Sequence, residues 1–452
     1  MYELKMLSII ILLLLLMSIL YSPIVSAELF KQENTFTEYI VENYLTKIIL
    51  DKSNGGIVKS YIYGNYKVSN LRYLAPGTIA PSILYEIIPP LTSTGTPPPV
   101  WWPGEVFGKK IVFNVVEENY YRLKINASFK ISSVYEVELN KIYTFYYDRP
   151  YFDIEYRFIN REDKTLKIDL SSIWNRRTSF SIEIATSFAG DADDDYQIYG
   201  TTEGKTVIRQ GYSSPGEADI VEGKIAYIAM ASSHNDYRIP QAIIVIPLED
   251  TINETLGVWF EQAGLGLEGV PVSSVVRLEI KAFSLGSNDV KTYKFRVYMG
   301  PLIKFVLQEL NLAPLLAELT KRYNIPDSLP NYTFKTEYKL SININPDNKN
   351  LYPNATLTIY RVMEDGSFSK IDSFPVEPRT LTLSQPGIYK IVIAPGRGMT
   401  RDGKHLYTNI TIGNQTGSEF CIPVYDDTSI TLNVNFELVV WLHITFIDEN
   451  DQ

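Results

Sequence analysis

Apolar side chains recur at every second position in many segments of this chain, and this period constrains the fold more than any other feature. Between residues 152 and 158 the even positions are apolar and the odd positions are charged, and residues 293–297 and 389–393 show a similar alternation. Successive side chains of a strand point to opposite faces, so the pattern is typical of half-buried β-strands. The 32 tyrosines also suit antiparallel sheets. The sequence therefore predicts an all-β protein.

One segment has a clear helical period. Apolar residues between 303 and 310 fall on one helical face, and Pro314 breaks or kinks the run before residues 315–319. A proline-containing linker follows at residues 326–331. We therefore expect a large antiparallel sandwich domain over residues 28–325 that closes with one helix.

Residues 332–427 contain short apolar segments separated by turn signals, a spacing that predicts a smaller Ig-like sandwich. Beyond it, residues 428–452 form a separate segment in which every even position from 430 to 446 is apolar. The pattern is too long for one ordinary strand. One interpretation is the start of a further module. Another is an assembly arm, so that self-association occurs through residues 430–446.

The N-terminus predicts export. Residues 7–25 are apolar and small residues follow, which is typical of a signal peptide over residues 1–27. The alternative is an uncleaved membrane anchor formed by residues 7–25. In both cases the chain from Glu28 onward lies outside the cell or on its surface. A single cysteine, Cys421, excludes an intrachain disulfide.

Six Asn-x-Ser/Thr sequons are candidate glycosylation sites in an exported chain. They lie at Asn126, Asn253, Asn331, Asn354, Asn409 and Asn414. The alternation around Asn126 predicts that this side chain points away from the core.

The net charge of −10 comes with scattered Lys and Arg and no basic stripe, so we expect no nucleic-acid partner. Asp191, Asp193 and Asp195 have the spacing of the first three ligands of a calcium loop. Tyr196 then stands where the turn needs glycine, and Thr202 where a bidentate Glu is expected. The segment therefore predicts either a Ca²⁺ site or a solvated acidic loop.

Two adjacent tryptophans, Trp101 and Trp102, lie in a proline-rich stretch that favours an extended backbone. They are candidate ligand-binding residues, because their rings could stack on a sugar or fill a partner's groove. The alternative is that they pack the loop onto the sandwich.

Three stretches carry a family resemblance: Ile40–Ser60 with its Gly-Gly turn, Tyr151–Asn160 ending on Asn, and Tyr293–Pro301 running into the helix. Together they resemble the β-supersandwich of galactose-mutarotase-like proteins, and more closely the periplasmic domain of the bacterial membrane-protein insertase. The resemblance implies a supersandwich fold for the large domain. It does not imply the insertase's function, since this chain continues into an Ig-like module.

No catalytic motif stands out. Mutarotases use a histidine and a carboxylate, and His234 is the one histidine of the large domain. We therefore expect a secreted or cell-surface non-catalytic β-protein that binds glycan or extended peptide, or serves in a surface assembly. The alternatives are a carbohydrate-active enzyme and an insertase-like chaperone or translocation accessory.

Overall fold

The computed structural model describes residues 30–439 except 44, 54, 65, 70–83, 88–109, 120, 132–134, 170–177, 187–195, 211–218, 233–239, 266–270, 328–336, 347–355, 364–365, 385–386, 395–404, 413–414, 418 and 425–426. Two compact units divide between Phe334 and Lys335. The linker expected at residues 326–331 precedes this division by a few residues.

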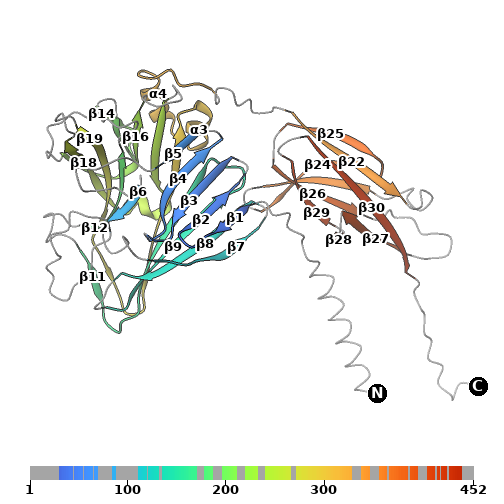
Figure 1. Ribbon diagram of the computed structural model, residues 1–452, viewed down its shortest axis with the longest axis horizontal. Coiled ribbons are helices and arrows are strands. Elements are labelled where there is room, and N and C mark those ends of the chain that lie inside the picture. Colours follow the sequence, from blue (N-terminus) through green and yellow to red (C-terminus); the bar gives the residue numbers. More distant parts are fainter. Residues whose placement is uncertain are drawn as a thin grey trace, which may run out of the picture. The chain divides into compact units, whose positions relative to one another are not determined.

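Within the described residues, the larger unit contains a ten-stranded, a nine-stranded and a two-stranded sheet, in which all the pairings given are antiparallel (Figure 1). The order in the ten-stranded sheet is β1 (Lys31–Asn34), β2 (Glu38–Glu42), β3 (Thr46–Asp51), β4 (Ile57–Tyr63), β6 (Leu84–Ile87), β12 (Thr178–Thr186), β19 (Pro271–Lys281), β18 (Thr255–Leu265) and β15 (Asp219–Glu222), with β5 (Tyr66–Ser69) paired to β4. The order in the nine-stranded sheet is β14 (Thr206–Gln210), β13 (Tyr196–Thr201), β16 (Ile225–Ser232), β17 (Gln241–Pro247), β21 (Val290–Pro301), β10 (Tyr151–Asn160), β9 (Val137–Tyr146), β8 (Arg122–Lys130) and β7 (Phe113–Glu118). The two-stranded sheet pairs β11 (Leu166–Ile168) with β20 (Phe283–Leu285).

An aromatic core joins the two large sheets. The Phe180 ring of β12 lies 5.2 Å from Phe158 of β10 and 5.0 Å from Tyr293 of β21, centroid to centroid. On β4, Tyr61 packs against Phe152 in the same way. The apolar half of each alternating segment therefore faces the opposite sheet, and the predicted all-β sandwich is confirmed.

Two of the stretches that carry the family resemblance contain residues that fix the local backbone. Gly55 and Gly56 lie in the turn between β3 and β4, and Gly56 has a φ of +74°. A Cβ atom there would lie 2.7 Å from the Ile111 side chain, so the left-handed backbone and the close packing both favour glycine. At the end of β10, the buried Asn160 amide donates to three backbone carbonyls, those of Lys164, Leu285 and Gly286.

The helical run predicted after β21 is divided into two short helices, α3 (Lys304–Glu309) and α4 (Ala313–Leu319). Asn311, with a φ of +56°, lies between them, and Pro314 stands in the first turn of α4. A 3-10 helix, η2 (Glu249–Glu254), precedes β18. Within the ranges that the structure describes, no helix is both long enough and apolar enough to cross a bilayer.

The smaller unit is a two-sheet sandwich, as its turn spacing predicts. One sheet has the order β25 (Arg379–Leu383), β22 (Tyr338–Pro346), β30 (Thr428–Val439), β27 (His405–Ile412) and β28 (Gln415–Gly417). The other has the order β24 (Phe368–Pro375), β23 (Thr356–Val362), β26 (Gly387–Ala394) and β29 (Glu419–Val424). Leu340, Ile359, Ile391 and Leu432 are fully buried in the core between them.

The strand that the sequence sets apart from this sandwich is one of its inner strands. β30 pairs in parallel with β22 and antiparallel with β27. Residues 428–434 pair with β22 and residues 433–439 pair with β27, so among the described residues both backbone edges are paired only at Asn433 and Val434. The remainder of the expected arm, residues 440–446, lies outside the described residues.

Candidate functional site

A buried polar cluster lies on the face of the ten-stranded sheet that points away from the core. Phe180 packs against the opposite sheet, so Ser181 and Glu183 of β12 point the other way. On β19 the register places Arg277 opposite Glu183 and Glu279 opposite Ser181. With Trp259 of β18, which pairs with Arg277, these residues form what we call the Glu–Arg cluster. Thr178, at the start of β12, belongs to the same face by its pairing with Lys281.

Burial distinguishes this cluster from an ordinary outer face. Glu183 is 2 % exposed, Glu279 is fully buried and Arg277 is 8 % exposed. Charged side chains are almost never fully buried unless they are paired. The outer face of these three strands is therefore a protected polar environment.

An ion pair organises the cluster. The Arg277 Nε atom donates to Glu183 Oε2 at 2.6 Å, and Arg277 Nη2 lies 2.5 Å from the same oxygen. The guanidinium also lies over the Trp259 ring, 5.3 Å from its centroid. Arg277 is thus fixed by a carboxylate on one strand and an aromatic ring on another, in a cation–π contact.

Two hydroxyls of the cluster have no hydrogen-bond partner among the described residues. Thr178 Oγ1 and Ser181 Oγ are buried, and both residues are fully inaccessible. A buried polar group left unsatisfied costs about 1–3 kcal/mol. Such groups are rare in native proteins, and a bound water, ion or ligand is one of the partners that can satisfy them.

The chemistry of the cluster suits a polyhydroxylated ligand. Glu183 and Glu279 lie on diagonal positions of neighbouring strands, where Cα atoms are about 7–8 Å apart. Carboxylates accept hydrogen bonds from hydroxyls, guanidinium and Ser or Thr hydroxyls donate them, and an indole ring packs on apolar faces. The two carboxylates also provide the residue types that acid–base chemistry requires.

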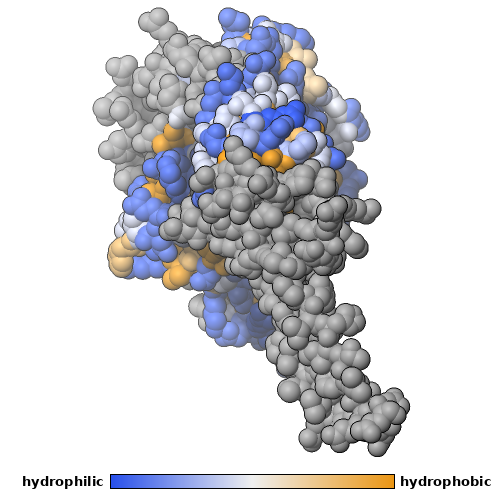
Figure 2. All heavy atoms as spheres, turned by 90° about the vertical axis from the view of Figure 1, so that its right-hand side faces the viewer, coloured by the Kyte–Doolittle hydropathy of each residue, from blue (hydrophilic) through white to orange (hydrophobic). Residues whose placement is uncertain are grey.

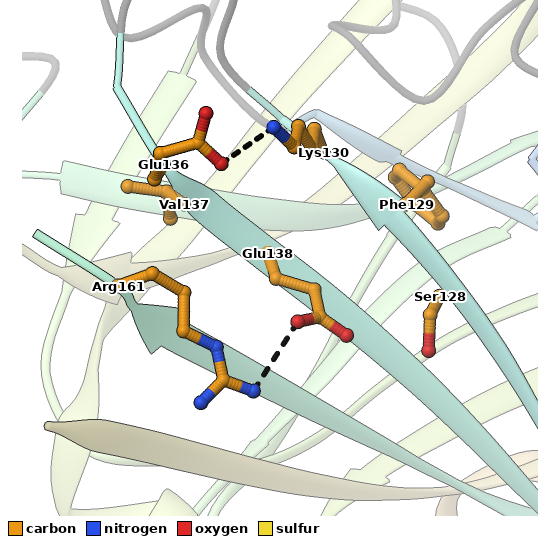
Figure 3. Close-up of a pocket in the computed structure, with 7 residues that line it drawn as sticks. All are labelled: Ser128, Phe129, Lys130, Glu136, Val137, Glu138 and Arg161. Carbon is orange, nitrogen blue, oxygen red and sulfur yellow. Dashed lines mark hydrogen bonds and ion pairs between the residues drawn. The ribbon is translucent and has the colours of Figure 1, made fainter. Parts of the chain in front are cut away.

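Two surface hollows in the nine-stranded sheet are less suitable. The hollow in Figure 3, of about 200 Å³, lies beside β8 and β9. Its two cations are engaged, since Lys130 lies 2.5 Å from Glu136 and Arg161 lies 3.4 Å from Glu138. A second hollow of about 430 Å³, beside η2, is lined by Lys294 with its partner Glu249 and by Arg157 with its partner Glu155. On the face drawn in Figure 2, hydrophilic residues likewise cover most of the coloured surface.

Most of the site residues predicted from sequence cannot be placed. Trp101, Trp102, Asp191, Asp193, Asp195, His234, Asn331, Asn354 and Asn414 lie outside the described residues. Within the described residues, no group of three or more His, Cys, Asp or Glu side chains could hold a metal ion. The Ca²⁺ site therefore stays a prediction.

The sequons within described strands and turns differ in accessibility. Asn126 of β8 follows the predicted alternation, because Leu123 and Ile125 are fully buried while Asn126 is half-buried on the other face. Its amide donates to Ser128 Oγ at 3.1 Å. Asn253 in η2 is exposed and accepts a hydrogen bond from Lys224. Asn409 lies in β27, paired with Asn435 of β30.

The Glu–Arg cluster was not predicted from sequence. Glu183 alternates with Ile182 and Ile184, and Arg277 alternates with Val276 and Leu278, which is also the pattern of a solvated outer face. The two strands are almost a hundred residues apart, and only the fold shows that these charges are paired and buried.

Comparison with known proteins shows a similarity of fold only. No protein-family model and no curated protein matches the chain. Among solved structures, 58% of the chain is similar to 97% of a galactose mutarotase related enzyme from Lactobacillus acidophilus, at 10% identity and a TM-score of 0.39. The same share is similar to 99% of a galactose mutarotase-like protein from Lactobacillus casei, at 12% identity and a TM-score of 0.39.

A third similar structure is a TPR-domain containing protein from Parabacteroides distasonis, at 10% identity and a TM-score of 0.35. The chain spans 47% of the length of that protein. The mutarotase-like resemblance indicated by the sequence thus recurs among solved structures, and it concerns the β-sandwich fold alone. The insertase resemblance has no support in these matches and stays a prediction.

Proposed function

We propose that the protein is an exported β-protein that binds carbohydrate, and that the Glu–Arg cluster is the binding site. The observation that carries the proposal is the pair of buried hydroxyls of Thr178 and Ser181, which have no hydrogen-bond partner among the described residues, beside Glu183, Arg277 and Glu279. Sugar hydroxyls both donate and accept hydrogen bonds, so they can satisfy carboxylates, a guanidinium and these hydroxyls together.

The test removes one hydroxyl and measures affinity and stability separately. Isothermal titration with a panel of neutral oligosaccharides should find at least one that binds. Ser181→Ala should then weaken that binding about tenfold, because one buried hydrogen bond is worth about 1 kcal/mol or more. The thermal midpoint should stay the same or rise, because the variant no longer buries an unsatisfied hydroxyl.

Ser60→Ala is the matched control. Ser60 lies on β4 of the same sheet, and its hydroxyl is also buried without a partner among the described residues. β4 is separated from β12 by β6, so this hydroxyl is remote from the cluster. It should change stability as Ser181→Ala does but leave binding intact. Equal binding by wild type and Ser181→Ala would refute the cluster as the site.

A second candidate function is a carbohydrate-active enzyme, and it is favoured by the placement of Glu183 and Glu279 on one face. Glycosidases use two carboxylates several Å apart. In an enzyme, Glu279→Gln would abolish release of reducing ends from a bound polysaccharide while binding persists. In a binding protein, no reducing ends appear with the wild type either.

The exported location is a separate part of the proposal and rests on the apolar N-terminal stretch and the sequons. Mass spectrometry of the protein isolated from its own cells would test it. A mature chain that begins near Glu28 supports a cleaved signal, and an intact N-terminus in a soluble cytoplasmic fraction contradicts export.

A further inference from the structure

A third hollow of the larger unit, which we call the apolar hollow, has a volume of about 360 Å³. Its lining residues come from the β13–β14 turn, β16, β17, η2 and the turn between α3 and α4. Tyr227, Ile246, Ile252, Leu310 and Leu312 contribute to its walls. The apolar hollow shares no lining residue with the Glu–Arg cluster, and the chemical character of the two sites differs.

The described residues that line the apolar hollow include no charged side chain. The two other hollows of this sheet are lined mainly by charged residues, such as Lys130 and Glu136 in one and Lys294 and Glu249 in the other. In a chain with 21% charged residues, a charge-free lining selects against ions. A charged ligand would lose its hydration here without gaining an opposite charge.

Four uncharged polar side chains line the hollow, those of Thr201, Thr202, Tyr227 and Asn311. Thr201 Oγ1 is buried and has no hydrogen-bond partner among the described residues. Asn311, whose left-handed backbone forms the α3–α4 turn, is exposed at the rim. The Tyr227 hydroxyl is already hydrogen-bonded to Thr206 at 2.6 Å. Thr201, Thr202 and Asn311 are therefore the side chains left to fix the polar end of a ligand, and among them only the Thr201 hydroxyl is buried without a partner among the described residues.

The wall of the hollow is preformed. Gly200 pairs with Tyr227 across β13 and β16, and a Cβ atom on Gly200 would lie 2.1 Å from the Tyr227 ring. The absence of that atom lets the ring lie close to the strand. Leu310 and Leu312, which also line the hollow, are 6 % and 5 % exposed. A rigid site loses less ordering entropy on binding than a mobile one.

We propose that the apolar hollow binds a small neutral molecule with an apolar body and one hydrogen-bonding end, of the chemical class of an aryl or alkyl alcohol. Ligand sites of about 300–1,000 Å³ with an apolar lining and a few convergent polar groups are typical of small-molecule binding. The hydroxyl of the ligand pairs with Thr201 Oγ1 and its apolar body packs on Tyr227, Ile246 and Ile252.

The test uses the full-length protein with p-cresol as the probe and 4-hydroxybenzoate, its charged analogue of similar shape, as the comparison. Titration followed by protein NMR shifts or calorimetry should give a dissociation constant below about 1 mM for p-cresol, which is reachable for a ligand of this size. The affinity for 4-hydroxybenzoate should be at least about tenfold weaker because the lining offers it no cation.

Two variants locate the binding. Ala226→Leu fills the hollow from β16 and should abolish p-cresol binding, and Thr201→Val removes the hydroxyl with little change of shape and should weaken it about fivefold. Thr292→Val, in the charged hollow beside η2, is the matched control and should bind p-cresol as wild type does. A circular dichroism melt confirms that each variant is folded.

The proposal is overturned if p-cresol fails to bind folded wild-type protein, if 4-hydroxybenzoate binds as tightly, or if Ala226→Leu binds like wild type. None of these outcomes bears on carbohydrate binding, because Ser181→Ala and Ala226→Leu alter different sites.

Discussion

The outer faces of the two large sheets each carry an arginine paired with a carboxylate, in different surroundings. On the ten-stranded sheet, Arg277 pairs with Glu183, and their side chains are 10 % and 3 % exposed. On the nine-stranded sheet, Arg296 pairs with Asp153, and theirs are 23 % and 16 % exposed. In both cases an arginine meets a carboxylate directly across an antiparallel pair of strands.

The contacts around the two guanidinium groups are also alike. Arg296 donates from Nε and Nη2 to the two oxygens of Asp153, at 2.9 and 3.1 Å, and stacks on Tyr151 with 4.1 Å to the ring centroid. Arg277 lies over Trp259. Burial alone would lower the pKa of Arg296, but the hydrogen bonds and charge of Asp153 raise it on balance. The difference between the two pairs is therefore mainly access to water.

Removing the buried arginine, Arg277, should have the largest effect on stability. Arg277→Met should destabilise the larger unit by about 3–5 kcal/mol, because it removes the arginine that pairs with the buried Glu183 carboxylate. Urea unfolding followed by tryptophan fluorescence measures the change.

A second variant separates charge from packing. Glu183→Leu combined with Arg277→Met removes both charges and should recover most of the lost stability, since apolar replacements of buried ion pairs are often neutral. It should also abolish carbohydrate binding if the cluster is the site. If the double variant is as unstable as Arg277→Met alone, the loss comes from packing and not from an unpaired charge.

The more accessible pair, Arg296 with Asp153, should respond less. Arg296→Met should cost about 1 kcal/mol, because water reaches Asp153 more readily than Glu183 and only the stacking on Tyr151 and a partly buried ion pair are lost. Sodium chloride at 1 M should shrink this loss but leave the effect of Arg277→Met nearly unchanged, since salt screens exposed charges more than buried ones. A loss as large as that of Arg277→Met would contradict the assignment to water access.

The sandwich fold could be predicted from the sequence, but the different burial of the two arginine–carboxylate pairs could not. Alternation around Ile154 and Phe295 predicts strands with one apolar face, because a side-chain period of two has no other common source. The same alternation surrounds Asp153, Arg296, Glu183 and Arg277. It does not predict whether the outer face of a sheet is exposed to solvent or buried. Burial of Glu279 and Arg277 follows from long-range packing, which no local pattern encodes.

The sequence predicted one feature of the backbone, the break in the helical run, but not another, the position of β30. Pro314 signals the break in the helical run, and the structure places it in the first turn of α4. The inner position of β30 was not predicted, because its sequence fits any strand with one buried face, and its parallel partner β22 lies some ninety residues earlier. Strand pairing between distant segments is set by the whole core and not by the strand itself.

The smallest expected effect is a change in the pH dependence of stability, and it concerns Tyr146, which contacts Asp153 of the more accessible pair. Tyr146 donates its hydroxyl to Asp153 at 2.7 Å, and burial, followed by the charge of Asp153, raises the pKa of Tyr146 above its usual value near 10. The folded state therefore keeps this proton when the unfolded state has lost it. The resulting contribution to stability is complete below about pH 10 and declines as pH rises further.

Tyr146→Phe should therefore lower stability by less than about 1 kcal/mol at pH 7, the worth of one half-exposed hydrogen bond, and should make the decline above pH 10 shallower. Urea unfolding at pH 7, 9, 10.5 and 11 measures both. Asp153→Asn, which keeps an acceptor but removes the charge, should also make the decline shallower, though by less, since burial is the larger cause. Identical slopes above pH 10 for wild type and Tyr146→Phe would mean that the exposed network admits enough water to let Tyr146 ionise as it does in the unfolded chain, and the contrast with the buried pair would then be larger than the side-chain exposures suggest.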